Sequence, residues 1–250
     1  MNDDWKVWNQ NKAYGELLYK RATGELPEME CSKRIAKEIK TFINEDETIL
    51  DVGCGAGHYL RSLRKDIGDS FFYTGCDATE HYIELARQAF SNDNRASFSV
   101  TDIFALDFAD NSFDVVMCNN VLLHLPSIEQ PLRELIRVAK KYLIIRTLCG
   151  NRSFRIKDVI TQDDGCEFLP GGEPITFYYY NIYSKSYVSY LLSANPKVQC
   201  WKISADYEFD KRRIEESAKE HTNINATQII GDYQVNGYVL QPWAILTVTL

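Results

Sequence analysis

The sequence predicts an α/β fold with a mostly parallel sheet and helices on both of its faces. Two observations carry this prediction. From residue 45 to residue 147, short apolar runs alternate with segments whose apolar residues recur at helical spacing, which is the pattern of repeated βα units. In addition, the first apolar run leads through a glycine-rich turn, Gly53 to Gly57, into a helix. Such crossover connections place successive strands parallel to one another.

The bulk properties of the chain fit one large domain. Its 250 residues suffice for an α/β core, and 45% apolar and 25% charged residues are ordinary for a globular protein. The net charge of −7 argues against a general nucleic-acid or anionic-membrane surface, since phosphate contacts need concentrated lysine and arginine. No secretory signal and no apolar run of about 18 residues is visible. Seven cysteines without C-x-x-C spacing indicate reduced thiols, so we expect a cytoplasmic location.

Residues 1–44 precede the alternating pattern, and we expect them to form a helical extension in front of a domain over residues 45–250. Helical spacing predicts one helix over Ser32 to Asn44 and a further helix before it. Several aromatic residues lie in this extension, among them Trp5, Trp8 and Tyr14. They either pack the extension onto the domain or form part of a lid over a ligand.

The first strand, Thr48 to Val52, is followed by three alternating glycines. Without Cβ atoms the chain can turn tightly, and the N-terminus of the following helix is a natural seat for an anionic group. Asp77 comes twenty positions after Gly57, at the end of a second apolar run from Phe71 to Cys76. A carboxylate at that place can accept hydrogen bonds from a ribose, so the pair predicts a nucleoside ligand.

The following elements complete the βα pattern. Ser127 and Gln130 resemble a capping box at the start of the last of these helices. The expected elements are helices over Gly57 to Ile67, Glu80 to Phe90 and Ser127 to Lys141, and strands over Ala96 to Val100, from Phe113 onward and over Tyr142 to Thr147.

The turn has the sequence DVGCGAG, from Asp51 to Gly57. A dinucleotide fingerprint would require glycine where His58 stands, and the phosphate-loop motif is absent. The turn resembles instead the first motif of class I S-adenosylmethionine-dependent methyltransferases, and the resemblance extends over Ser32 to Leu148. The later stretch VLLHLP, Val121 to Pro126, is similar to the small-molecule group that includes the quinone-biosynthetic methyltransferases, and no NPPY-type motif of DNA N-methyltransferases is present.

The resemblance implies a Rossmann-like sheet of seven strands, mostly parallel, with an antiparallel final strand. It implies S-adenosylmethionine as cofactor and S-adenosylhomocysteine as product. In this family the acid after the third strand binds the adenine amino group, although such an acid can also merely cap a loop. The residues that match cofactor-binding positions are Asp51, Gly53, Cys54, Gly55, Gly57, Asp77, Ala78, Asp102, Ile103 and Asn119, with Arg21 from the extension and Tyr14 as a second candidate there.

His124 is the candidate catalytic residue, because a histidine beside the transferred methyl group could accept a proton from a hydroxyl or an amine. The alternative is a histidine bonded to backbone in a structural role. His58 is expected to support the site rather than to act in catalysis. No set of residues has the spacing of a metal site, so none is predicted.

After the fifth strand the pattern loosens, and the resemblance implies a substrate-cover insertion over residues 147–183. A short helix is expected over Phe154 to Ile160. The aromatic block from Phe177 to Tyr183 either binds a ring of the substrate or forms a hairpin that packs the edge. Four cations near this cover could bind a phosphate or carboxylate, or lie in solvent: Arg146, Arg152, Arg155 and Lys157.

The tail is expected to supply a helix over Ser184 to Ala194 and β-rich runs over Lys197 to Phe209 and Tyr238 to Leu250, with a helix over Lys211 to His221 between them. The expected activity is methyl transfer to a small-molecule acceptor, anionic or aromatic, with no nucleic-acid or membrane partner. Three alternatives stay open: a protein or RNA methyltransferase, a non-catalytic cofactor-binding module, and, more remotely, aminopropyl transfer.

Overall fold

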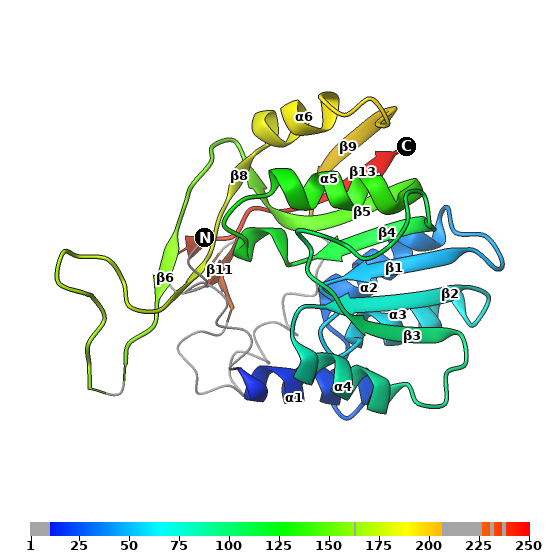
Figure 1. Cartoon of the computed structure of the whole chain (residues 1–250), viewed down its shortest axis with the longest axis horizontal. Helices are drawn as coiled ribbons and strands as arrows, with labels where there is room; N and C mark the ends of the chain where they lie inside the picture. The colour runs from blue at the N-terminus through cyan, green and yellow to red at the C-terminus, as the bar shows by residue number, and fades with distance from the viewer. Residues whose placement is uncertain (1–10, 163, 207–226, 231–232, 237–238) are drawn as a thin grey trace.

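The structure is a computed structural model, and it describes residues 11–162, 164–206, 227–230, 233–236 and 239–250. Its centre is one sheet in the order β3-β2-β1-β4-β5-β13-β9, with a short strand β8 added beside β5 (Figure 1). The strands are β1 (Thr48–Val52), β2 (Phe72–Asp77), β3 (Ala96–Val100), β4 (Phe113–Asn119), β5 (Ala139–Gly150), β8 (Tyr183–Ser184), β9 (Cys200–Ala205) and β13 (Trp243–Thr249).

The first five strands run parallel, and β13 runs antiparallel to both β5 and β9. The predicted seven-stranded, mostly parallel sheet with an antiparallel final strand is therefore confirmed, and β8 is an eighth strand that the sequence did not indicate. The run that includes β9 was predicted to reach Phe209, which lies outside the described residues. So does the helix expected over Lys211 to His221.

Helices cover both faces of the sheet, as expected. Helices α2 (Glu30–Lys40) and α3 (His58–Ile67) pack on one face, and α5 (Glu129–Val138) and α6 (Lys185–Ser193) pack on the other (Figure 1). Because side chains alternate along a strand, Ile49 joins the core under α2 and α3, while its neighbour Leu50 joins the core under α5. Both side chains are fully buried, and each contributes about 1.5–3 kcal/mol by leaving water.

Helix α1 (Lys12–Thr23) packs against α4 (Glu80–Ala89) near the β3 edge of the sheet (Figure 1). The contact depends on Gly15, because a Cβ there would lie 2.7 Å from the ring of Tyr82. The Tyr82 hydroxyl also donates a hydrogen bond to the carbonyl of Asn11 at 2.9 Å. These contacts anchor the N-terminal extension to the sheet domain. No helix in the described part of the chain is long and apolar enough to cross a bilayer.

Two local predictions were wrong. The helix expected over Phe154 to Ile160 is instead the strand β6 (Lys157–Val159), which pairs antiparallel with β7 (Phe177–Tyr179). The reason is that the backbone of this segment pairs with the aromatic block, for example Tyr180 N–H with the carbonyl of Ile156 at 2.9 Å. Helix α5 begins after Ile128 without a side-chain cap, so the capping box does not form.

The remaining elements are short. A 3₁₀ turn, η2 (Leu122–His124), follows β4. Three strands near the end of the chain form a separate antiparallel sheet: β10 (Gln228–Ile230), β11 (Tyr233–Asn236) and β12 (Val239–Leu240).

Candidate active site

A cavity of about 410 Å³ opens at the carboxyl ends of the parallel strands. Its floor is the turn after β1, where Gly53 and Gly55 take left-handed φ angles of 79° and 54°. A Cβ on Gly53 would lie 2.2 Å from Cγ2 of Val121, so the turn requires glycine for both its conformation and its packing. The sheet thus brings the turn and the ends of β2, β3 and β4 around one space, as the sequence predicted for a ligand site.

Asp77 ends β2 and lines this cavity together with Ala78. Its two carboxylate oxygens accept the N–H groups of Gly55 at 3.0 Å and of Thr79 at 2.9 Å. Burial raises the pKa of Asp77, and those backbone hydrogen bonds oppose the rise. The Thr79 side chain and the Ala78 N–H also bond this carboxylate and oppose the rise, and the carboxylate still borders the cavity.

Asp102 and Ile103 also line the cavity, in the loop after β3. One oxygen of Asp102 accepts the N–H of Phe104 at 2.9 Å, so this carboxylate caps its own loop, as the alternative interpretation expected. The same side chain borders the cavity, so capping and ligand binding are compatible. Ile103 is 8% exposed and adds an apolar wall.

Asn119 ends β4, and its buried side-chain amide is the feature that most directly indicates a polar ligand. Its side chain is 5% exposed and lines the cavity. Neither its amide nitrogen nor its amide oxygen has a hydrogen-bond partner in the described part of the chain. A buried polar group without a partner costs about 1–3 kcal/mol. A ligand with both donor and acceptor character, such as an amino-acid moiety, would satisfy it.

Four predicted cofactor residues lie outside the cavity lining. Asp51 is buried under the turn, where the Tyr73 hydroxyl donates to it at 2.7 Å and burial raises its pKa to about 7. Cys54 is fully buried, and Gly57 is the N-cap of α3. Arg21 donates to the carbonyl of Pro27 at 2.9 Å. None of these four residues lines the cavity.

The extension instead contributes Tyr14 and Leu18 of α1 to the lining. Sequence reasoning missed Leu18, Met29, Tyr59 and Tyr82 as lining residues, and helical spacing alone would have assigned most of them to the core. His58 lines the cavity at the start of α3, and burial lowers its pKa to about 3. Its Nδ1 has no partner among the described residues.

Arg146 was one of the four cations expected near the substrate cover, but its side chain is engaged elsewhere. Its Nε donates to Asp206 at 2.6 Å and its Nη1 donates to the side-chain oxygen of Asn120, also at 2.6 Å. The guanidinium lies 3.9 Å from the ring centroid of Trp243. Arg146 is not part of the cavity lining. It bonds the side chain of Asn120, which does line the cavity and has a left-handed φ of 61°.

His124 lines the cavity at the end of η2. Its Nδ1 lies 2.8 Å from the carbonyl of Tyr179 on β7. A carbonyl only accepts, so Nδ1 carries the proton and the lone pair is on Nε2. Burial lowers the pKa of His124 to about 4, which keeps the ring neutral near pH 7. The ring is bonded to backbone, as the alternative interpretation expected, and it also borders the cavity, so its catalytic role stays a prediction.

The hairpin that supplies this carbonyl is fixed to η2 by Asn181, which is fully buried. Its N–H donates to the carbonyl of Leu123 at 2.9 Å, and its side-chain nitrogen donates to the carbonyl of Leu125 at 2.9 Å. The aromatic block is thus a hairpin, and Tyr178 and Tyr180 make edge contacts with the His124 ring.

Fold and cavity together define an α/β domain with a cavity at the ends of its parallel strands. A family model described as "Methyltransferase domain" matches residues 43–166. Residues 43–166 therefore match the methyltransferase-domain family, as the resemblance implied.

Similar proteins extend this finding. The 2-methyl-6-phytyl-1,4-hydroquinone methyltransferase of Synechocystis is 41% identical over 93 residues, which are 37% of this chain and 29% of that protein. Demethylmenaquinone methyltransferase of Staphylococcus aureus is 31% identical over 108 residues, 43% of this chain and 44% of that protein. The chain thus matches less than half the length of these relatives.

Among solved structures, magnesium protoporphyrin IX methyltransferase from Synechocystis with bound S-adenosylmethionine is similar to this chain with a TM-score of 0.57. The alignment covers 100% of this chain and 98% of that one at 14% identity, so this likeness concerns the fold.

Proposed function

We propose that this chain is an S-adenosylmethionine-dependent methyltransferase that acts on a small-molecule acceptor. The observation that carries the proposal is the cavity at the strand ends, with the unpartnered Asn119 amide on one side and the Asp77 carboxylate on another. The match of residues 43–166 to the methyltransferase-domain family supports it.

The residues of the cavity fit the parts of this cofactor. Asp77 would accept the ribose hydroxyls, and Asp102 with Ile103 would hold the adenine ring. Asn119 would bond the amino-acid end, for which the turn at Gly53 and Gly55 leaves room. When bound, the cofactor would supply an electrophilic methyl group on its sulfonium. The chain contributes by holding donor and acceptor in line, which is the main source of catalysis expected here.

The acceptor end would lie toward Asn120, Val121 and His124, which border the same cavity. A neutral His124 with its lone pair on Nε2 suits removal of a proton from an acceptor hydroxyl or amine. The apolar and aromatic residues on this side, including Tyr59 and Leu125, favour a ring-containing acceptor.

An anionic acceptor would require a cation from the cover. Arg155 on the hairpin is exposed and lies 5.1 Å from the Tyr179 ring centroid, whereas Arg146 is held by Asp206. Arg155, outside the cavity lining but beside the hairpin, is therefore a candidate for contact with an anionic acceptor. The extension over residues 1–44 and the insertion over residues 147–183 would form the two sides of a cover.

A cytoplasmic location agrees with the absence of disulfides among all seven cysteines, each of which is described.

Two measurements test the proposal. Calorimetric titration with S-adenosylhomocysteine should show one site per chain, and a methyl-labelled cofactor should transfer label to a component of a pooled metabolite extract. Asn119→Ala should weaken the binding, whereas Asn195→Ala, outside the cavity lining, should not. Label appearing only in added RNA or protein would support the corresponding alternative. Binding without transfer to any acceptor class would favour a non-catalytic module, and absence of binding would refute the proposal.

A further inference from the structure

Three side chains on one face of α5 hold the loop that connects β3 to β4. Gln130, Glu134 and Arg137 are spaced four and three residues apart, so they project from the same side of the helix. The opposite, apolar side of α5 is buried against the sheet through Leu132 and Leu135. The helix is therefore fixed by its core contacts and presents a rigid polar surface to the loop.

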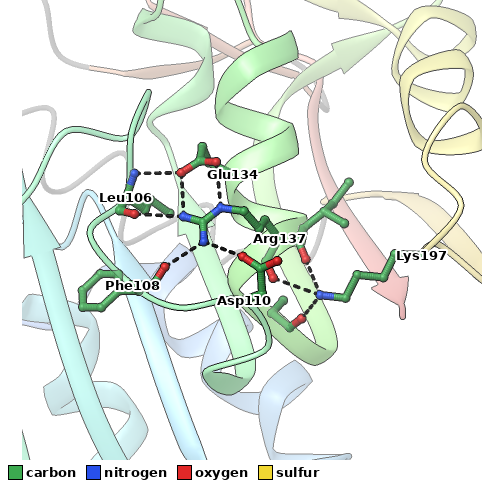
Figure 2. A network of polar contacts seen from close by, with 8 residues as sticks. Leu106, Phe108, Asp110, Glu134, Arg137 and Lys197 are labelled. Carbon is green, nitrogen blue, oxygen red and sulfur yellow. Dashed lines mark hydrogen bonds and ion pairs between the residues drawn. The ribbon is translucent and has the colours of Figure 1, made fainter.

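The contacts of these three residues go mostly to the loop backbone. Gln130 donates to the carbonyl of Phe104 at 2.6 Å. Glu134 accepts the N–H of Leu106, and Arg137 donates to the carbonyl of the same residue, both at 2.9 Å. The backbone of Leu106 is thus bonded on both sides, as Figure 2 shows.

Arg137 joins further groups into the same network. It donates to the carbonyl of Phe108 at 2.7 Å and to Asp110 at 2.8 Å, and two of its nitrogens bond the Glu134 carboxylate, each at 2.8 Å (Figure 2). Lys197 bonds carbonyls at the C-terminal end of α5, including that of Arg137 at 3.1 Å (Figure 2). The end of the helix that carries the guanidinium is therefore also held in place.

The loop residues that this network holds directly follow, in the sequence, two residues that line the cavity. Asp102 and Ile103 line the cavity, and the next residue, Phe104, is bonded by Asp102 through its N–H and by Gln130 through its carbonyl. Leu106, two residues further, is 4% exposed and shares the core cluster of Ile103. A loop without these bonds would have to be ordered when a ligand binds, at a cost in affinity.

We propose that Gln130, Glu134 and Arg137 are positioning residues for recognition of the adenine base, acting through Asp102 and Ile103 without touching the ligand. This inference rests on the proposed function, since it requires a nucleoside cofactor in the cavity. A base that is read by a positioned loop should be distinguished from a close analogue. A loop that has lost its support should bind the base and its analogue more weakly, and it should distinguish less well between the two.

The test compares the dissociation constants of S-adenosylhomocysteine and S-inosylhomocysteine, which differ at the exocyclic group of the base. Arg137→Lys keeps the charge but loses the forked donor geometry, and Gln130→Leu removes one contact next to the cavity. Each should weaken S-adenosylhomocysteine binding roughly fivefold to tenfold and reduce the affinity ratio between the two ligands at least about threefold.

Arg64→Lys is the matched control. Arg64 lies on α3 and holds another loop by similar chemistry, with donors to Asp93 at 2.8 Å and to the carbonyl of Phe71 at 3.2 Å, and it is not a cavity residue. Its substitution should lower the melting temperature as Arg137→Lys does but leave the affinity ratio unchanged.

An unchanged ratio in a folded Arg137→Lys or Gln130→Leu protein overturns the inference, as does equal affinity of the unaltered chain for both ligands. Should Arg137→Lys fail to fold, Gln130→Leu decides. Absence of S-adenosylhomocysteine binding by the unaltered chain would instead refute the proposed function itself.

Discussion

Asp77→Asn is the substitution that tests the site most directly. The amide has nearly the shape of the carboxylate, but it replaces one acceptor oxygen by a donor nitrogen. The two oxygens of Asp77 accept the N–H groups of Gly55 and Thr79, and the carboxylate lines the cavity, where a ribose hydroxyl would also donate to it. In the variant, one oxygen keeps both functions, and the other position can no longer accept from either the backbone or the ligand.

The magnitude follows from the bonds lost. One charge-assisted hydrogen bond to the ligand contributes about 1.5–3 kcal/mol. The dissociation constant for S-adenosylhomocysteine should therefore rise roughly 10- to 160-fold. At a ligand concentration 100 times the dissociation constant of the unaltered chain, ligand-induced stabilisation of that chain is about 2.7 kcal/mol. A 12-fold weaker site would retain about 1.3 kcal/mol at the same concentration, a difference that ligand-dependent urea unfolding resolves.

Asp114→Asn serves as the control. Asp114 lies on β4 near its start, at the opposite end of the sheet, and accepts the backbone N–H of Thr48 at 3.1 Å. Hydrogen bonds from Thr48 and Lys141 lower the pKa of Asp114 to about 2 despite its burial, so this carboxylate stabilises the fold at neutral pH. Its loss should reduce stability without changing S-adenosylhomocysteine affinity. A folded Asp77→Asn protein that binds as tightly as the unaltered chain would show that Asp77 does not bind the ribose.

Three further substitutions or conditions give separate tests. If His124 is the base, the acid limb of kcat/KM should lie near pH 4, and a limb near pH 6.5 would contradict the lowered pKa of this buried ring. The contribution of the ring to the free energy of unfolding should also be lost as the pH falls from about 6.5 through 4, because the unfolded state takes up the proton first. Gly53→Ala should cost about 2–5 kcal/mol in urea unfolding, from a left-handed alanine and overlap with Val121, and a loss below about 1 kcal/mol would contradict the turn geometry. Asp206→Asn should destabilise by about 3–5 kcal/mol because it leaves the buried Arg146 uncompensated, and an unchanged melting temperature would show that the pair is dispensable.

The fold and the floor of the site were accessible from the sequence because they depend on local pattern. The run from Thr48 to Val52 and the glycine turn determine a strand, a left-handed bend and a helix within one short stretch. Asp77 and Asp102 follow later strands, and parallel strands bring their carboxyl ends to one edge. Their convergence on a single cavity could therefore be predicted without any knowledge of the packing.

The parts that could not be predicted depend on partners distant in the sequence. Arg146 stands at the end of a strand, as a ligand-binding cation would, but Asp206, sixty residues later, takes its guanidinium. Gln130 suited a helix cap by spacing, and instead bonds the carbonyl of Phe104 in another loop. Phe154 to Ile160 has apolar residues compatible with a helix, yet its backbone pairs with a strand that begins at Phe177.

The two hydrogen bonds by which Asn181 fixes the hairpin to η2 limit how an acceptor can enter the cavity. The hairpin cannot swing off η2 as a flap unless the two carbonyl contacts of Asn181 break together with the Tyr179–His124 bond. Such opening would release the imidazole to exchange tautomers and expose it to water. An acceptor that enters while these bonds hold must therefore reach the cavity past other lining residues.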